Sequence, residues 1–144
     1  REKCPEELFT IIMRRFMMRL SNMLADTTDC HAHITGESVA QVASQTLLAI
    51  GCTDAVARYP VFRPCVGMDK QEIIAISRKI ETFDISIQPF EDCCTVFTPK
   101  HPKTRPDIHT VEEAEKALDI DGLCQRAFDG IKRILITADG VQDE

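Results

Sequence analysis

The sequence predicts an α/β fold with a mainly parallel sheet, and three observations support this prediction. Short apolar runs typical of strands alternate with longer stretches in which apolar residues recur at helical spacing. The run at residues 34–38 has the order of a strand end, a glycine turn and a helix cap. A capping-box sequence opens a further helix at residue 69. Strands that alternate with helices in this way pair in parallel and pack against the helices.

Composition and charge limit the classes of protein. The 144 residues suffice for one domain with a core, and 44% hydrophobic and 28% charged residues are ordinary for a soluble globular protein. No apolar run reaches the length of a membrane span and no signal peptide is evident, so we expect no membrane contact and a cytoplasmic location. The net charge of -6 does not favour nucleic acid, so any RNA contact needs a local basic patch or another domain.

The first predicted element is an amphipathic helix over residues 5–25. Arg14 falls roughly opposite the centre of its apolar stripe, and Arg15 and Arg19 fall nearer the edge. The residues expected to face the core are Leu8, Ile12, Phe16, Leu20 and Leu24.

A short strand over residues 30–34 is predicted next, followed by a helix over residues 38–48. Ser38 and Gln41 have the spacing of a capping box, and Gly36 lets the backbone turn tightly or approach a ligand. The residues expected to face inward are Val39, Val42, Ala43 and Leu47. A loop and helix start at the carboxyl end of a strand are where α/β proteins build ligand sites.

In the middle of the chain, the sequence predicts a second strand over residues 61–66 and a helix from Asp69 to about Ile80. Asp69 and Glu72 form its capping box, and its apolar stripe consists of Ile73, Ile76 and Ile80. The prolines between residues 81 and 106 predict an ordered loop there.

Two short helices are predicted near the end of the chain. The first covers residues 110–118, with Thr110 and Glu113 as its capping pair, and the second covers residues 121–134. Residues 134–137 either extend that helix or form a strand. Two or three strands are fewer than a parallel sheet covered by helices normally has, so we expect part of a domain.

The seven cysteines are odd in number and irregular in spacing, which does not suggest a secreted disulfide scaffold. Those expected to be small buried side chains are Cys4, Cys30, Cys52, Cys65 and Cys124. The adjacent Cys93 and Cys94 lie about 3.8 Å apart at their Cα atoms, too close for an unstrained disulfide. With no C-x-x-C pair and no standard histidine pattern, the sequence predicts no metal site.

The residues around Cys93 and Cys94 leave two interpretations open. One is a reactive thiol, with its pKa lowered by the cations that follow and raised by Glu91 and Asp92; the other is a packed loop. The cations are Lys100, His101, Lys103 and Arg105, and they in turn either contact RNA phosphates or form a solvated loop.

Four blocks of this sequence together resemble the bacterial tRNA 4-thiouridine synthetases, also called tRNA sulfurtransferases. The resemblance runs from Cys4 to about Pro106. The blocks are residues 13–17 (MRRFM), 35–46 (TGE to QT), 63–70 (RP to GMDK) and 87–102 (IQP to FTPKHP).

This resemblance implies an adenine-nucleotide hydrolase-like PP-loop domain, a partial Rossmann-like fold. It implies that ATP, accompanied by Mg²⁺, adenylates the C4 oxygen of a tRNA uridine, and that a cysteine persulfide then delivers sulfur supplied by a cysteine desulfurase. By motif, Arg14, Gly36 and Gln45 would contact ATP, with Glu37 a further site residue. Arg14 suits a phosphate contact.

The same resemblance makes Cys94 the expected sulfur carrier, with Cys93 as the fallback. The chain departs from the family pattern because it shows no glycine- and serine-rich PP-loop, no THUMP-type RNA-binding region and no rhodanese domain. We therefore expect residues 1–108 to be the carboxyl-terminal half of the catalytic domain and residues 109–144 an acidic helical tail, inactive in isolation. Some family members also supply sulfur for thiamine synthesis, usually through the rhodanese domain.

Two other functions remain open from the sequence. One is a non-catalytic association half-domain, in which an unpaired sheet edge promotes pairing into a homodimer. The other is a thiol-based metal-binding or redox protein.

Overall fold

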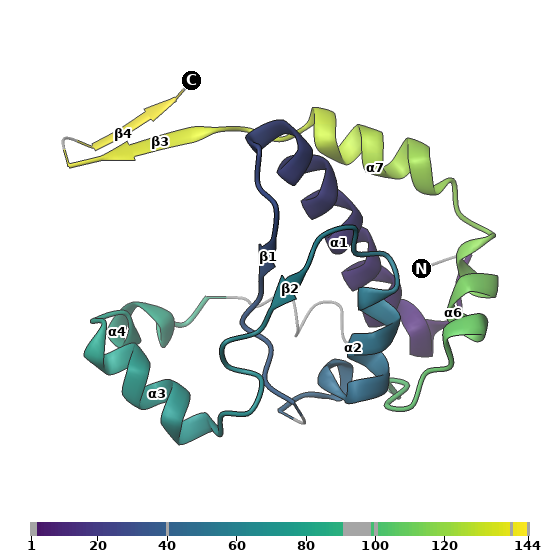
Figure 1. Ribbon diagram of the computed structural model, residues 1–144, viewed down its shortest axis with the longest axis horizontal. Helices are drawn as coiled ribbons and strands as arrows, with labels where there is room; N and C mark the ends of the chain where they lie inside the picture. The colour runs from purple at the N-terminus through teal and green to yellow at the C-terminus, as the bar shows by residue number, and fades with distance from the viewer. Residues whose placement is uncertain (1–2, 40, 91–98, 100, 139, 144) are drawn as a thin grey trace.

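The predicted α/β class is confirmed. The computed structural model describes residues 3–39, 41–90, 99, 101–138 and 140–143 as helices around a small parallel sheet, with a separate hairpin at the end (Figure 1). Within these ranges no helix has both the length and the apolar character needed to cross a membrane.

Helix α1 spans Phe9–Thr28 and follows the 3₁₀ turn Glu6–Leu8, so the first predicted helix is confirmed. Its buried face differs from the predicted stripe, because Phe16 and Leu20 are only half-buried and Leu24 is exposed. A strict spacing of four residues drifts about 40° around a helix at each step. The buried residues instead alternate spacings of three and four, and they include polar side chains: Leu8, Ile11, Ile12, Arg15, Met18, Asn22 and Ala25.

Both predicted strands are present but short. Strand β1, His33–Ile34, pairs in parallel with β2, Val61–Phe62, and the backbone N–H of Thr35 extends the pairing by donating to the Phe62 carbonyl at 3.0 Å. The carboxyl ends of both strands therefore meet at one edge of the sheet, which places Arg63 beside the loop at residues 35–38.

The helix predicted over residues 38–48 is wrong. Helix α2 spans Leu47–Asp54 after the 3₁₀ turn Ala43–Gln45, and its N-cap is Thr46, whose Oγ1 accepts from the third helical N–H at 3.2 Å. Ser38 does not cap a helix because its Oγ donates to the Met68 carbonyl at 2.8 Å. The expected inward face is wrong as well, since Val42 and Leu47 are exposed.

Helix α3, Lys70–Lys79, begins with the predicted capping box, in which Asp69 Oδ1 accepts from the Glu72 backbone and Glu72 Oε2 accepts from the Asp69 backbone. The predicted loop that follows is interrupted by the short helix α4, Phe83–Ser86, which the proline pattern did not indicate.

The last helices begin earlier than predicted. Helix α6, Ile108–Glu115, is capped by Asp107, whose Oδ2 accepts from the Thr110 N–H at 2.9 Å, so the predicted Thr110 cap is wrong. Helix α7, Ile120–Asp129, is capped by Asp119 and ends before residue 134. Residues 134–137 form β3, Ile134–Thr137, which pairs antiparallel with β4, Gly140–Asp143.

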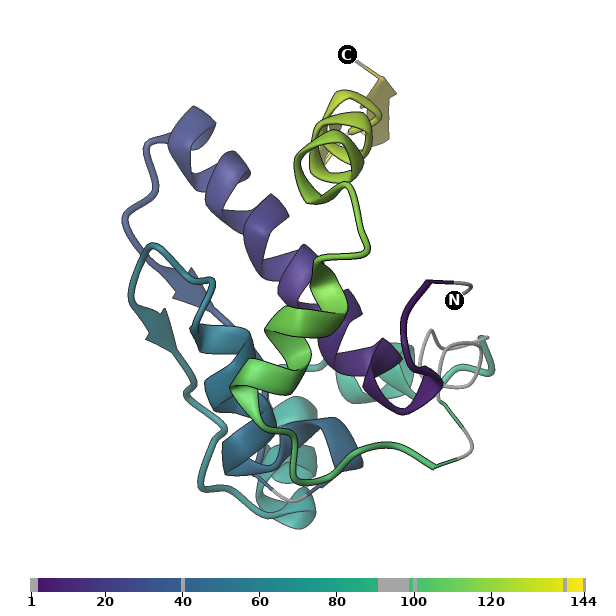
Figure 2. The same ribbon diagram turned by 90° about the vertical axis from the view of Figure 1, so that its right-hand side faces the viewer.

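The core lies where α1, α2 and α6 meet. Figure 2 shows α6 crossing close to α1, with α7 alongside the other end of α1. The buried cluster at this junction consists of Leu8, Ile11, Ile12, Cys52 and Val111. Residues 109–144 therefore contribute a buried side chain, Val111, to the same core as the start of the chain.

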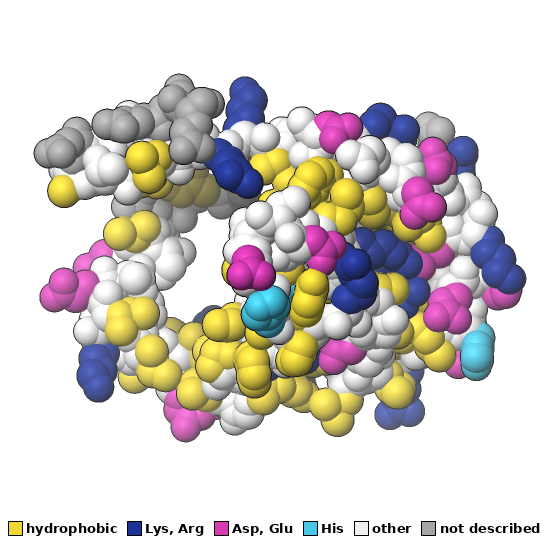
Figure 3. Space-filling model, turned by 45° about the horizontal axis from the view of Figure 1, so that its top comes forward, with side chains coloured by type: hydrophobic (Ala, Val, Ile, Leu, Met, Phe, Trp, Pro, Cys, Tyr) yellow, Lys and Arg dark blue, Asp and Glu magenta, His cyan; other side chains and the backbone are white. Residues whose placement is uncertain are grey.

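Two segments present apolar side chains to the surface. Among the residues that the structure describes, none in α3 or α4 is buried, and Ile76 and Ile80 of the predicted stripe are exposed. All four residues of β3 are exposed on the hairpin, which projects away from the helices in Figure 1. Hydrophobic side chains are visible over much of the face in Figure 3.

Candidate functional site

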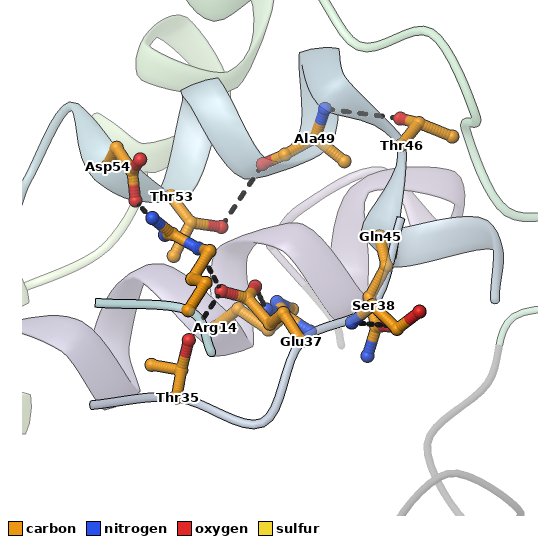
Figure 4. A network of polar contacts seen from close by, with 10 residues as sticks. Arg14, Thr35, Glu37, Ser38, Gln45, Thr46, Ala49, Thr53 and Asp54 are labelled. Carbon is orange, nitrogen blue, oxygen red and sulfur yellow. Dashed lines mark hydrogen bonds and ion pairs between the residues drawn. The ribbon is translucent and has the colours of Figure 1, made fainter. Parts of the chain in front are cut away.

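The loop at residues 35–38 brings the predicted Arg14, Gly36 and Gln45 together. Glu37 of this loop forms an ion pair with Arg14 of α1, and the backbone N–H of Ser38 donates to Gln45 Oε1 at 3.1 Å. Figure 4 shows Arg14 and Gln45 approaching the loop from different elements. The site lies at the carboxyl end of β1, where open α/β sheets bind ligands.

Glu37 is the centre of a polar cluster. The residue is only 4% exposed, and its Oε2 accepts from Thr35 Oγ1 at 2.9 Å and from Arg63 Nε at 2.6 Å. Arg63 also forms an ion pair with Asp54 at the end of α2. A buried carboxylate needs such partners, because an unpaired charge is costly to remove from water.

A cavity of about 250 Å³ lies against this cluster. Met13, Met17 and Met18 contribute to its wall, and Arg14 and Glu37 are among its charged groups. Small-molecule sites commonly combine a mostly apolar wall with a few placed polar groups. Gly36 and Gln45 are not among the residues that line this cavity, but a Cβ built on Gly36 would have no described atom within 4 Å, so the space beside Gly36 is open as well.

Arg63 is a site residue that the sequence analysis did not assign, although it lies in one of the four matching blocks. The predicted strand over residues 61–66 hid this role, because it placed Arg63 inside the strand, whereas β2 ends at Phe62 and Arg63 follows it directly. The carboxyl ends of neighbouring parallel strands meet at one edge, so a charged residue in this position belongs with the loop at residues 35–38.

Cys93 and Cys94 lie outside the described residues, as does Lys100. Of the basic patch around them, Lys103 lies beside the start of α1, where its backbone N–H donates to the Glu7 carbonyl at 3.1 Å and its Nζ pairs with Glu7 Oε1 at 3.3 Å. This cation is therefore tied to the body of the protein.

Five cysteines in the described part of the chain are free, and they are not all buried as expected. Cys52 and Cys124 are buried, and burial raises the pKa of both thiols. Cys30 is exposed because it follows the end of α1. Across the described ranges, no group of three or more His, Cys, Asp or Glu side chains is arranged to hold a metal ion.

A second arginine cluster joins α1 to α6. Glu115 is 3% exposed; its Oε1 accepts from Arg15 Nε at 3.0 Å and Arg19 Nη1 at 2.8 Å, and its Oε2 accepts from Arg15 Nη2 at 2.9 Å and Arg19 Nη2 at 2.7 Å. Arg15 Nη1 also donates to the Cys52 carbonyl at 2.6 Å. Burial alone would raise the pKa of Glu115, but the hydrogen bonds from Arg19 and Arg15 outweigh it and lower the pKa below its ordinary value.

The family model described as Thiamine biosynthesis protein (ThiI) matches residues 1–120. The chain belongs to the ThiI family. Proteins described as tRNA sulfurtransferases and a solved 4-thiouridine synthetase also match this chain, which confirms the predicted resemblance and shows a family of transferase enzymes.

Relatives in the ThiI family extend well beyond this chain. Two proteins described as "Probable tRNA sulfurtransferase" are similar to it. The one from Alkaliphilus oremlandii is 50% identical over 131 residues, which cover 91% of this chain and 33% of that protein. The one from Streptococcus uberis is 49% identical over 144 residues, which cover 100% of this chain and 36% of that protein. The chain therefore spans about a third of the length of these relatives.

A solved structure shares the fold closely. It is described as a crystal structure of a 4-thiouridine synthetase–RNA complex with bound ATP. The TM-score is 0.84 at 37% identity, over 90% of this chain and 34% of the other.

Proposed function

We propose that this chain forms part of an ATP-dependent enzyme that transfers sulfur to a tRNA uridine and so makes 4-thiouridine. The observation that carries the proposal is the Arg14–Glu37 cluster, which faces a cavity at the carboxyl end of the sheet. A chain of the same fold was crystallised with RNA and ATP, which supports both substrates.

The residues at the loop have distinct proposed roles toward ATP. Arg14 supplies a positive charge and planar N–H donors to a phosphate. The open space at Gly36 admits the nucleotide close to the backbone. Gln45 fixes the loop, because its Oε1 accepts from the Ser38 N–H. This bond would keep the Gln45 amide group close to the proposed nucleotide. Mg²⁺ would arrive with the phosphates.

We further propose that Cys94 carries the sulfur as a persulfide, with Cys93 as the alternative, and that a cysteine desulfurase loads it. Adenylation of the uridine C4 oxygen by ATP would release pyrophosphate, and attack by the outer persulfide sulfur on C4 would then release AMP. A second, resolving thiol would break the remaining S–S bond, which supplies the two electrons that the sulfur needs and leaves a disulfide. The persulfide must reach the activated uridine, so the tRNA would bind across the loop at residues 35–38. With a net charge of -6, the chain would rely on local cations or on other parts of the full-length enzyme to hold RNA.

Complementation of a strain that lacks 4-thiouridine tests the proposal. The full-length enzyme that carries these residues should restore 4-thiouridine in tRNA, measured by nucleoside mass spectrometry. Cys94→Ser should abolish the product and Cys93→Ser should not. The reverse pattern would move the role to Cys93, and full product from both variants would contradict a persulfide on either thiol.

Association with a second copy is a second candidate function, favoured by the exposed apolar surface of α3 and of the hairpin. An enzyme can also be a homodimer, so the two proposals are compatible. Sedimentation that shows a monomer at all concentrations would contradict the association. The family description names thiamine biosynthesis too, but the relatives and the solved structure are named for tRNA or RNA chemistry, so we place the tRNA reaction first.

A further inference from the structure

We infer that Glu37 is a positioning residue that fixes the Arg14 guanidinium at the cavity, and that Arg63 and Asp54 hold Glu37 in turn. The inference rests on the proposed function, because it explains how Arg14 is made ready for ATP. None of these three residues is needed to touch the nucleotide. The observation behind the inference is a row of alternating charges that runs from α2 to α1: Asp54, Arg63, Glu37 and Arg14.

The two oxygens of the Glu37 carboxylate have different partners. Oε2 accepts from Thr35 Oγ1 at 2.9 Å and from Arg63 Nε at 2.6 Å, and both donors belong to the edge of the sheet. Oε1 forms the ion pair with Arg14. Rotation of the carboxylate would break both bonds at Oε2, so the sheet edge determines where Oε1 points.

Arg63 is itself held at both ends of its guanidinium. Nε donates to Glu37 and Nη2 pairs with Asp54 of α2. The Arg63 side chain is 11% exposed, which leaves it little room to move. The row therefore links the ends of β1 and β2 to α2, and it fixes the position of the Arg14 side chain of α1.

Pre-positioning matters because an arginine side chain has many rotamers. A free arginine loses that freedom when it binds an anion, whereas one already held by a fixed carboxylate loses less. Direct contact between Glu37 and a phosphate is disfavoured, because the two negative charges repel each other. Glu37 should therefore act on ATP only through Arg14.

Titration of Mg·ATP into the full-length enzyme, followed by calorimetry, tests this inference through a double-mutant cycle. Glu37→Gln should weaken ATP binding about tenfold and Asp54→Asn about twofold, since Asp54 is one step further away. In the Arg14→Ala background neither substitution should cause a further loss. Glu113→Gln is the matched control. Glu113 forms an exposed ion pair with Lys116 at the end of α6, away from the row of charges, so this substitution should leave ATP binding unchanged.

Two results would overturn the inference. If Glu37→Gln weakened ATP binding by the same factor with and without Arg14, Glu37 would contact the nucleotide itself. If Arg14→Ala weakened binding while Glu37→Gln and Asp54→Asn did not, the row would be structural only. Should Glu37→Gln fail to fold, Asp54→Asn carries the test, because the Asp54 side chain is 38% exposed. A wild-type enzyme that bound no ATP would instead overturn the proposed function.

Discussion

Arginines on two sides of α1 form ion-pair clusters with two different buried glutamates. The difference between the clusters shows how the same pair of side-chain types can either stabilise the fold or hold an arginine at a cavity. Arg14 and Arg15 are neighbours in sequence but about 100° apart around the helix. Arg15, with Arg19, holds Glu115 of α6, whereas Arg14 holds Glu37 in the loop after β1.

The Glu115 cluster is closed by packing, whereas the Glu37 cluster is open to a cavity. Each oxygen of Glu115 accepts a hydrogen bond from both arginines, and the Arg15 side chain is 2% exposed. The Arg14 side chain is 19% exposed, about as much as Arg19, but Arg14 lies against a cavity of about 250 Å³ that neither Arg15 nor Arg19 lines. A closed cluster contributes to folding, while a held arginine beside open space is available to an anion. Packing around the ion pair, more than its chemistry, separates the two roles.

The largest expected effect comes from opening the closed cluster. Glu115→Ala leaves Arg15 buried without its carboxylate, and removing one partner of a buried pair costs about 3–5 kcal/mol of unfolding free energy. Urea unfolding of the chain measures it. Glu113→Ala on the same helix removes an exposed pair and should cost about 0–1 kcal/mol. A loss of unfolding free energy from Glu115→Ala as small as that expected for Glu113→Ala would show that the Glu115 cluster does not stabilise the fold.

Acid should weaken the same cluster. The pKa of Glu115 is lowered in the folded state relative to its ordinary value of 4.5, so the unfolded chain binds the proton more readily. The stabilisation is complete above that value and is lost as the pH falls through the folded pKa. Unfolding measured across this acid range should therefore show a steeper decline for the wild type than for Glu115→Gln. Parallel curves would contradict the lowered pKa.

Gly36→Ala, in the loop beside the open cluster, should weaken ATP binding while leaving the free energy of unfolding almost unchanged. An added Cβ meets no described atom within 4 Å, and the Gly36 φ is not positive, so unfolding free energy should change by no more than about 0.5 kcal/mol. In the full-length enzyme the methyl group should still weaken ATP binding, because it occupies the open side of the loop. Unchanged ATP affinity would remove Gly36 from the site.

The smallest effect concerns thiol exposure and leaves the fold unchanged. Among the cysteines that the structure describes, Cys30 should react first with iodoacetamide at neutral pH because it is exposed. Cys52 and Cys124 should react only after unfolding, since burial blocks access and raises the pKa of both thiols. Peptide mass spectrometry distinguishes the sites. Modification of Cys52 as fast as Cys30 would contradict the packing at α2.

Local signals were sufficient for some elements. The Asp69–Glu72 capping box depends on residues three apart, and it forms as predicted. The predicted Ser38 cap failed for a reason that is not local, because Ser38 bonds to Met68, 30 residues away, and the helix begins after Thr46 instead. Hydropathy likewise could not indicate a buried Arg15, whose partner Glu115 is 100 residues distant.

The candidate site was predicted by a different route. Family resemblance, and not periodicity, selected Arg14, Gly36 and Gln45, and the structure places all three around the loop at residues 35–38. Their contact with ATP remains a proposal. Arg63 was missed because the second strand was predicted to run to residue 66, whereas β2 ends at Phe62 and leaves Arg63 at the edge of the sheet. The Glu37 contacts could not be predicted, because they depend on the register of two strands and on the end of α2.

Calorimetric titration of Mg·ATP into the full-length enzyme, with Arg14→Ala compared with Arg19→Ala, tests the central claim most directly. The two side chains are 19% and 18% exposed, and each pairs with a buried glutamate, so they differ mainly in which cluster they serve. We predict that Arg14→Ala weakens ATP binding at least about tenfold and that Arg19→Ala leaves it within about twofold. Equal losses from both, or no loss from Arg14→Ala, would contradict the assignment of the open cluster to the nucleotide.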